Sequence, residues 1–163
     1  MTELPPFIPP LLDSHGSWDD FLTRLYAVFK NDFKDHTTVH QALPVRYDTR
    51  MLPDGDGKEE GFWHVISRDD NKSRQRLPEY RRAERLPWAR PLLEANAAKE
   101  VRVFDYDHGS KDKGVRRYVW LHAHDYVLVL IGRTNAFRWI TAYHVDSEGH
   151  RRDLQTRYNQ RIQ

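Results

Sequence analysis

The chain has 163 residues, of which 39% are hydrophobic and 31% are charged, and its formal net charge is +2. This length and composition are typical of one globular domain and argue against a disordered or collagen-like chain. The sequence contains no cysteine, which excludes a disulfide framework, a thiolate metal site and a cysteine nucleophile.

The first segment, residues 1–16, is predicted to be an extended, proline-rich lead-in. It carries four prolines and no basic region, so we do not expect it to act as a signal peptide. The longest apolar run, Tyr126–Ile131, has the length of a strand and is far too short to span a bilayer. We therefore expect a soluble protein of the bacterial cytoplasm with no membrane partner. We expect one domain over residues 1–163, with an N-terminal helix and loop over 17–60 and an α+β core over 61–163.

The first predicted element is an amphipathic helix from Trp18 to about Lys34. Ser17 is suited to cap it, and Asp19 and Asp20 lie in the first turn, where the helix dipole favours negative charge. Its apolar residues recur at three- and four-residue spacing, which predicts a core-facing stripe. The stripe comprises Trp18, Phe21, Leu22, Leu25, Tyr26, Phe29 and Phe33.

The middle of the chain gives weaker signals. Residues 36–61 are predicted to be mainly loop, with a short strand over 45–51 and a turn at 53–57. The segment Phe62–Arg68 is rich in aromatic and β-branched residues and is compatible with a strand or a helix. A polar loop over 69–76 and a helix over 79–98 follow, and Pro87 and Pro91 predict a break in that helix near Trp88.

The last third has a clear β pattern. Turn residues separate four predicted strands, and a closing helix follows them. The strands are expected over 101–106, 115–122, 126–133 and 137–145, and the helix over 150–160. The order of elements predicts an α+β fold in which N-terminal helices pack on one face of an antiparallel meander of four to five strands.

The final predicted strand can be divided into two faces, because side chains alternate along a strand. Ile140 and Ala142 suit the face covered by helices, so Trp139, Thr141 and Tyr143 are expected to point the other way. Arg133 and Trp120 on neighbouring strands could join that second face. An aromatic, hydroxyl-bearing face flanked by arginine is suited to stacking bases and holding phosphate. The alternative is a sheet face that packs under the proline-rich N-terminal segment.

His64 and Arg68 form the second candidate feature. At a spacing of four they lie on one side of either a helix or a strand. Histidine can accept or donate a proton near neutral pH, and an arginine beside it could neutralise a phosphate. The following helix adds the arginines Arg81, Arg82 and Arg85. The alternative is a structural histidine beside a solvated basic helix face.

His122 and His124, with Asp125 beside them, are the only candidate metal ligands with a suggestive spacing. A spacing of two matches no common zinc arrangement that nearby residues could complete. We therefore predict neither a metal nor a cofactor. The sequence also contains no glycine-rich phosphate loop, nucleophile-elbow serine or H-E-x-x-H motif.

Three short segments resemble the barnase–EndoU–colicin–RelE group of small nucleases, and most closely its phage- and toxin-associated branches. They are the histidine segment Gly61–Arg68, the arginine- and tryptophan-bearing helix Tyr80–Arg90 and the late strand Trp139–Tyr143. The resemblance covers residues 61 to 158 and leaves the first helix as an addition.

The resemblance implies an RNA-cleaving enzyme that needs no metal and leaves a 2′,3′-cyclic phosphate. By position, His64 would be the general base or acid, and Thr141 and Tyr143 would orient the phosphate or protonate the leaving oxygen. The phosphate oxygens would be held by Arg68 and one of Arg81, Arg82 or Arg85. Some branches carry a second histidine or a lysine in the pocket, and the sequence does not place either. The residues implied to bind RNA are Arg81, Arg82, Arg85, Trp88, Trp120, Arg133 and Trp139.

The resemblance further implies RNA and an antitoxin or immunity protein as partners, within a toxin–antitoxin or mobile-element system. Two alternatives stay open. One is a non-catalytic RNA- or protein-binding domain that uses the same basic and aromatic face, and the other is a structural or accessory protein of phage origin.

Overall fold

The computed structural model describes residues 3–69, 76–95 and 97–163. Its helical segments are α1 (Trp18–Phe29), the π-helical η1 (Lys30–Lys34), α2 (Glu60–Ile66), α3 (Tyr80–Ala83), the 3₁₀ segment η2 (Leu86–Trp88), α4 (Ala89–Glu94), the 3₁₀ segment η3 (His122–His124) and α5 (Glu148–Asn159). Its strands are β1 (Val39–His40), β2 (Leu43–Arg46), β3 (Ser67–Asp69), β4 (Arg76–Pro78), β5 (Val101–Asp107), β6 (Val115–Leu121), β7 (Tyr126–Gly132) and β8 (Phe137–His144). The predicted α+β class is confirmed.

The main sheet has six strands in the order β1-β2-β8-β7-β6-β5. Strands β5 to β8 form the predicted antiparallel meander. The expectation of a purely antiparallel sheet is wrong, because β2 pairs parallel to the start of β8 and carries β1 with it. The β2–β8 register involves only Val45 with Phe137 and Arg46 with Arg138. Such a short pairing leaves no periodicity in the sequence from which it could be predicted.

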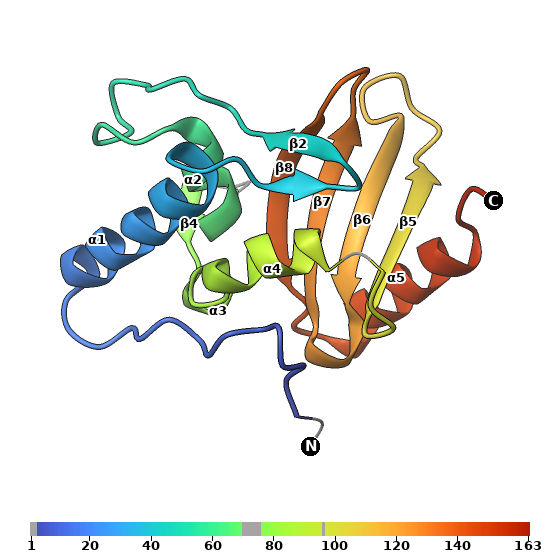
Figure 1. Ribbon diagram of the computed structural model, residues 1–163, viewed down its shortest axis with the longest axis horizontal. Helices are drawn as coiled ribbons and strands as arrows, with labels where there is room; N and C mark the ends of the chain where they lie inside the picture. Colours follow the sequence, from blue (N-terminus) through green and yellow to red (C-terminus); the bar gives the residue numbers. More distant parts are fainter. Residues whose placement is uncertain (1–2, 70–75, 96) are drawn as a thin grey trace.

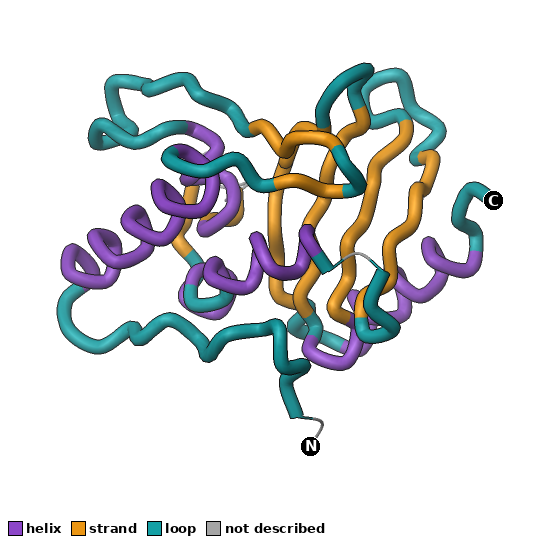
Figure 2. The backbone as a smooth tube through the Cα atoms, viewed as in Figure 1, coloured by secondary structure: helices purple, strands orange, loops and turns teal. Residues whose placement is uncertain are grey.

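Helices lie on both faces of this sheet. Figure 1 shows α4 and the β1–β2 hairpin in front of the strands, with α1 and α2 beside them, and α5 on the opposite side. The tube in Figure 2 shows the same layers, with the strands between the two sets of helices. The larger core lies on the first face and includes Phe29, Phe62, Leu92 and Leu128. A second core under α5 shows that the expectation of helices on one face only is wrong.

The second core is built from alternate residues of the meander and from α5. Its buried members are Phe104, Tyr118, Trp120, Val127, Val129, Val145 and Leu154. We call the sheet surface that carries them the α5 face. The short sequence spacing from β8 to α5 allows the helix to fold back under the meander, and Leu154 anchors it there.

The first helix confirms its prediction. Ser17 caps α1, and its side chain accepts a hydrogen bond from the Asp20 backbone N–H at 3.1 Å. Phe21, Leu25 and Phe29 are fully buried, and the helix continues through η1 to Lys34.

The ambiguous segment Phe62–Arg68 contains both a helix and a strand. It begins inside α2, which ends at Ile66, and Ser67 then adopts extended backbone angles and opens β3. The predicted polar loop that follows falls mostly on residues 70–75, which lie outside the described residues. The predicted helix over 79–98 is interrupted as expected near Pro87, which lies in η2 between α3 and α4.

A bulge in β8 changes which residues share a face. Val129 pairs with Thr141 and Leu130 pairs with Trp139, so Ile140 is an extra residue between two ladder pairs. Because of the bulge, Trp139 lies on the face of the larger core, packed against Phe33, and not beside Thr141 and Tyr143 as the alternation predicted.

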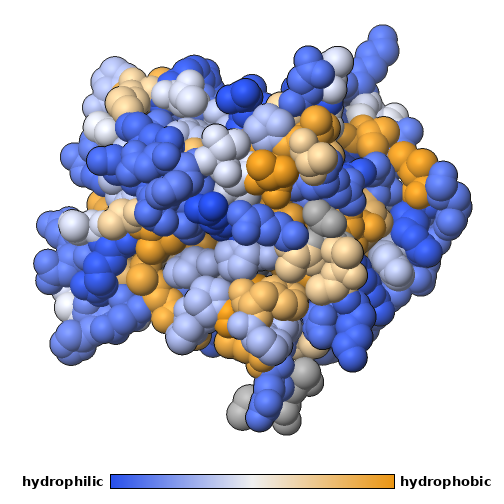
Figure 3. All heavy atoms as spheres, viewed as in Figure 1, coloured by the Kyte–Doolittle hydropathy of each residue, from blue (hydrophilic) through white to orange (hydrophobic). Residues whose placement is uncertain are grey.

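None of the described helices combines the length and the apolar character needed to cross a membrane. On the face seen in Figure 3, hydrophilic residues cover most of the surface and hydrophobic residues form only small groups between them.

Candidate functional site

The predicted residues His64 and Thr141 are brought together where β8 continues beyond its pairing with β2. The Thr141 hydroxyl donates a hydrogen bond to the backbone carbonyl of His64 at 3.2 Å, which ties the end of α2 to the strand. Both side chains are half-buried. The Thr141 hydroxyl proton is therefore used in the hydrogen bond that positions α2. The hydroxyl oxygen can still accept a hydrogen bond from a ligand.

The predicted residue Arg68 lies in the middle of β3 and is exposed. Its charge lies near that of Arg82 and contributes to lowering the pKa of the Arg82 guanidinium, although burial is the larger cause. Arg82 donates to the backbone carbonyl of Ser67 and forms an ion pair with Glu79 at 3.5 Å. A pair of arginines is therefore held at the junction of β3 and α3.

The predicted residue Tyr143 lies on the α5 face, two residues after Thr141. Its ring stacks on His150 of α5, with centroids 4.8 Å apart and planes 20° apart. Burial raises the pKa of the Tyr143 phenol well above its usual range, and the guanidinium groups of Arg157 and Arg82 act in the opposite direction. Tyr143 is therefore influenced by Arg82, which was predicted, and by Arg157, which was not.

The structure adds three residues to this site, His108, Tyr118 and Arg157. The His108 Nε2 atom lies 2.8 Å from the Tyr118 hydroxyl, and Arg157 donates to the same hydroxyl at 3.3 Å. Since the hydroxyl accepts from Arg157, it can donate its proton to His108 Nε2 when the imidazole is neutral. We call His108, Tyr118, Tyr143 and Arg157 the α5-face cluster.

The electrostatic environment favours a neutral His108. Burial, and then the charges of Arg157, Lys113 and Arg116, lower the pKa of the His108 imidazole, while Asp107 has a smaller opposite effect. Burial raises the pKa of Tyr118, and Arg157 again acts in the opposite direction. At neutral pH the cluster therefore holds an imidazole that can accept a proton beside a guanidinium that can bind an anion.

The cross-strand register sets the spacing within the site. Tyr118 pairs with Val129, and Val129 pairs with Thr141, so Tyr118 and Thr141 lie two strands apart in one row. Two strand spacings amount to about 10 Å. The His64 backbone at Thr141 and the Tyr118 hydroxyl with its partners thus lie at opposite ends of this row, while Tyr143 lies on the same strand as Thr141.

A signal for the missed residues was present in the sequence. Arg116, Tyr118 and Trp120 alternate on β6, as Phe104, Tyr106 and His108 do along β5 and the residue that follows it. Aromatic and basic residues at every second position mark one face of a hairpin. The position of Arg157, by contrast, depends on how α5 folds back, which no local pattern gives.

The three tryptophans predicted to stack on RNA are buried. Trp88 and Trp139 belong to the larger core with exposures of 3% and 2%, and Trp120 belongs to the core under α5 with an exposure of 2%. Their rings pack against Tyr126, Phe33 and the Arg102 guanidinium, respectively. In this structure they support the sheet and do not offer free rings to a ligand.

The remaining predicted arginines occupy different surroundings. Arg81 is exposed on α3, whereas Arg85 donates to the Arg81 carbonyl at 2.7 Å and lies over the Trp88 ring at 5.2 Å. Arg133 follows β7 at the turn into β8 and is exposed. The structure thus brings Arg82 close to Tyr143 and Arg68 close to Arg82, and it places Arg133 at the other end of β8.

His122 and His124 lie in η3, outside the cluster. His124 Nε2 lies 3.2 Å from the carbonyl oxygen of Glu3, and both histidines border a hollow of about 260 Å³. Within the described ranges, no group of three or more histidine, aspartate or glutamate side chains is placed to hold a metal ion.

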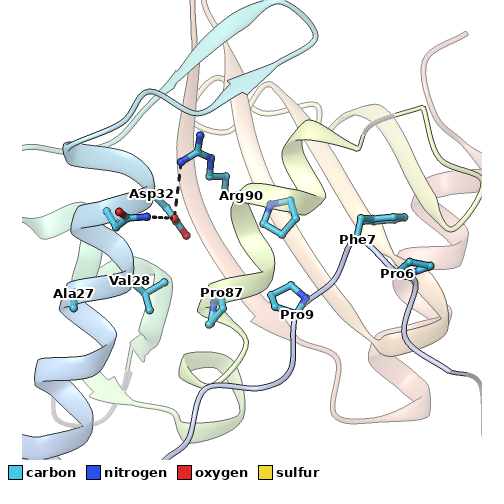
Figure 4. A pocket seen from close by; sticks show the side chains of 10 residues that line it. Pro6, Phe7, Pro9, Ala27, Val28, Asp32, Pro87 and Arg90 are labelled. Carbon is cyan, nitrogen blue, oxygen red and sulfur yellow. Dashed lines mark hydrogen bonds and ion pairs between the residues drawn. The ribbon is translucent and has the colours of Figure 1, made fainter.

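A groove of about 690 Å³ lies between α1, α4 and the N-terminal segment. Prolines line much of it, and Asp32 and Arg90 face each other there at 4.0 Å (Figure 4). The groove lies on the side of the helices and does not include the α5-face cluster.

No family model, curated protein sequence or solved structure matches this chain. We therefore infer the function of the chain from the geometry of the site.

Proposed function

We propose that the protein is a metal-independent endoribonuclease that cleaves RNA by attack of a ribose 2′-OH on the adjacent phosphate. The observation that carries this proposal is the α5-face cluster, in which His108 and Arg157 meet at the hydroxyl of Tyr118, with Tyr143 beside them. The resemblance to the barnase–EndoU–colicin–RelE group supports the same reaction. Within that proposal the protein is the toxin of a toxin–antitoxin or mobile-element system, and an antitoxin or immunity protein is its partner.

The phosphate is assigned to the space beside Tyr143. Arg157 and Arg82 act on this phenol from different elements, α5 and α3, so two elements supply a guanidinium group near it. Arginine is suited to this role because its planar fork binds two phosphate oxygens at once, and preorganised positive charge stabilises the transition state.

The two proton transfers are assigned to His108 and His64. The 2′-OH gives its proton to the Tyr118 hydroxyl oxygen, and that hydroxyl passes its own proton to His108 Nε2 as the 2′-O–P bond forms; the lowered pKa of the His108 imidazole favours Nε2 as an acceptor. The imidazole of His64, whose backbone carbonyl is held by Thr141, gives a proton to the 5′-oxygen as the P–O5′ bond breaks. The products are a 2′,3′-cyclic phosphate and a free 5′-hydroxyl, and no other reactant is needed.

A non-catalytic RNA- or protein-binding domain is the second candidate. It is favoured by the 2% exposure of Tyr118, whose hydroxyl already has two partners, and by the engagement of the Thr141 hydroxyl. In this alternative the same hydrogen bonds serve only to fix α5 on the sheet.

The deciding experiment is incubation of the full chain with RNA in the presence of EDTA, followed by analysis of the fragment ends. The proposal expects 2′,3′-cyclic phosphate and 5′-hydroxyl termini. His108→Ala should reduce the rate at least about 100-fold, in line with the loss of a general base, while the control His15→Ala, at an exposed position in the N-terminal segment, should not change it. RNA that is bound but left intact by the parent chain would instead favour the binding domain.

Expression in bacterial cells tests the toxin assignment. The parent chain should arrest growth, and His108→Ala should relieve the arrest at equal protein level. Arrest that persists in this variant would contradict a toxic role for RNA cleavage.

A further inference from the structure

Three arginines surround a hollow at the start of β8. The hollow measures about 270 Å³ and is lined by Arg46, Tyr47, Arg133, Ala136, Phe137 and Arg138. Its lining contains no carboxylate, and it brings together β2, the turn after β7 and the first residues of β8. This volume suits a small group such as a phosphate, since it lies at the lower end of the range for small-ligand sites.

The backbone holds two of these charges side by side. Arg46 and Arg138 are register partners in the parallel β2–β8 pair, so their side chains leave the same face of neighbouring strands. Like charges directly opposite one another destabilise a sheet. We expect two arginines to be placed opposite each other where a bound anion offsets the repulsion between their guanidinium groups.

Only part of the positive charge is neutralised within the described part of the chain. Arg138 lies 3.6 Å from Asp48, whose carboxylate also accepts hydrogen bonds from Arg50. These contacts lower the pKa of Asp48 to about 2, so it is already committed as an anion. Arg46 and Arg133 have neither a hydrogen-bonded nor an ion-paired side-chain partner among the described residues, and both are exposed.

The hollow opens near the proposed active face. Arg138 pairs with Ile131, and Val129, two residues earlier on β7, pairs with Thr141, so Arg138 and Thr141 leave the same α5 face despite the bulge. The register partners of Arg138 and Tyr143 on β7 are Ile131 and Val127, four positions apart, which corresponds to about 13 Å along the strand. A single phosphate cannot reach both places, whereas an oligonucleotide lying along β8 can.

From this arrangement we propose that Arg46, Arg133 and Arg138 form a phosphate subsite that binds the backbone of an RNA strand extending from the α5-face cluster along β8. The assignment of RNA rests on the proposed function, but binding at the subsite does not require cleavage. The subsite would make the protein prefer oligonucleotides long enough to span β8 over dinucleotides.

The test uses 2′-O-methyl oligonucleotides, which cannot undergo 2′-OH attack, so that binding is measured separately from cleavage. The affinity of the full chain for a dodecamer and for a dinucleotide is compared between the parent, Arg46→Gln/Arg133→Gln and the control Arg152→Gln, an exposed arginine on α5. Circular dichroism and thermal unfolding confirm that each variant is folded.

The proposal expects the double variant to lose roughly tenfold in dodecamer affinity for each arginine removed. It should leave dinucleotide affinity unchanged, and the slope of log affinity against log salt should fall by about 1.4, or about 0.7 for each lost phosphate contact. Equal losses in the double variant and in Arg152→Gln would overturn the subsite. Inorganic phosphate, added at the same concentration as the phosphate groups of the dodecamer, should not displace the dodecamer. If it does, the site binds free phosphate and the oligonucleotide assignment is wrong.

The two proposals can fail separately. If the parent chain never cleaves RNA but the double variant loses dodecamer binding, the subsite is retained and the ribonuclease is rejected. If the parent cleaves RNA and the double variant binds the dodecamer equally well, the ribonuclease is retained and the subsite is rejected.

Discussion

At the scale of single residues, two buried tyrosines have opposite hydrogen-bonding states. The Tyr118 hydroxyl has partners in His108 and Arg157, whereas the Tyr126 hydroxyl, in a fully buried side chain, has no partner among the described residues. A buried hydrogen bond adds about 1 kcal/mol to stability, and an unsatisfied buried group costs a similar amount or more. The two residues should therefore respond differently to the same substitution.

We expect Tyr118→Phe to lower the free energy of unfolding by about 1 kcal/mol and Tyr126→Phe to leave it unchanged or raise it. Urea unfolding followed by tryptophan fluorescence would measure both. Equal destabilisation by the two substitutions would contradict this assignment of hydrogen-bond partners.

A residue-scale prediction also concerns the pH dependence of activity. If His108 is the general base, activity should fall at low pH as its imidazole becomes protonated. Because burial and neighbouring arginines lower the pKa of this imidazole, the acid limb of kcat/KM should have its midpoint below 6.5. Measuring kcat/KM for cleavage from about pH 4.5 to about pH 8, a range that includes the free histidine pKa, would give the midpoint of the acid limb. A midpoint above 6.5 would exclude His108 in this environment as the base.

At the scale of elements, the β1–β2 turn carries backbone strain. Gln41 and Ala42 both have positive φ, at 48° and 68°. The turn is held because Gln41 Oε1 accepts a hydrogen bond from Arg117 at 2.5 Å and His40 Nδ1 lies 3.0 Å from the Leu93 carbonyl oxygen. A side chain in this conformation costs about 1–2 kcal/mol, which glycine avoids.

Ala42→Gly should therefore stabilise the protein by about 1 kcal/mol and raise its melting temperature. Ala123→Gly is the matched control, since Ala123 is exposed but has no positive φ, and it should be neutral or destabilising. A lower melting temperature for Ala42→Gly would show that the turn is not strained at this position.

The elements also show what the sequence could predict. Local patterns predict helix α1, the break at Pro87 and the four meander strands. Capping residues, prolines and alternating apolar residues each affect the backbone conformation of residues only a few positions away in the sequence. The pairing of β2 with β8 and the bulge at Ile140 were not predicted, because each depends on contacts between distant parts of the chain.

The same reasoning applies to the candidate site. Tyr143 and Arg82 were predicted from strand and helix periodicity, and the structure brings them close together. The prediction that Trp139 shares a face with Thr141 and Tyr143 was wrong. The extra residue Ile140 in β8 moves the side chains of the preceding residues to the opposite face of the sheet. Arg157 could not be predicted, since its contact with Tyr118 joins residues that are 39 positions apart.

At the scale of the whole molecule, several histidines are held in their neutral form. Burial is the largest cause lowering the pKa of His40, His108, His122 and His144 below 6.5. In the unfolded chain these residues bind protons more readily, so the unfolded state is favoured as the pH falls below 6.5. Their contribution to stability is present above pH 6.5 and is lost towards the lower pKa values of the folded state.

We therefore expect the melting temperature to fall as the pH is lowered from 7 to 5, a window that begins about half a unit above the free histidine pKa and ends about one and a half units below it. A second decrease should occur below the usual aspartate pKa of 3.8, as Asp48 becomes protonated towards its folded value of about 2. Scanning calorimetry across this range would test both steps. A melting temperature that stays constant between pH 7 and 5 would contradict the neutral buried histidines.

The central claim is that the α5-face cluster holds the phosphate at which RNA is cleaved. Its most direct test is the single-turnover rate of RNA cleavage in EDTA by Arg157→Gln and by Arg152→Gln, which remove one arginine each from the same helix. The account predicts a rate about 100-fold below that of the parent for Arg157→Gln, comparable to the loss of one transition-state contact, and an unchanged rate for Arg152→Gln. Equal rates for the two folded variants, or a parent chain that does not cleave RNA, would contradict it.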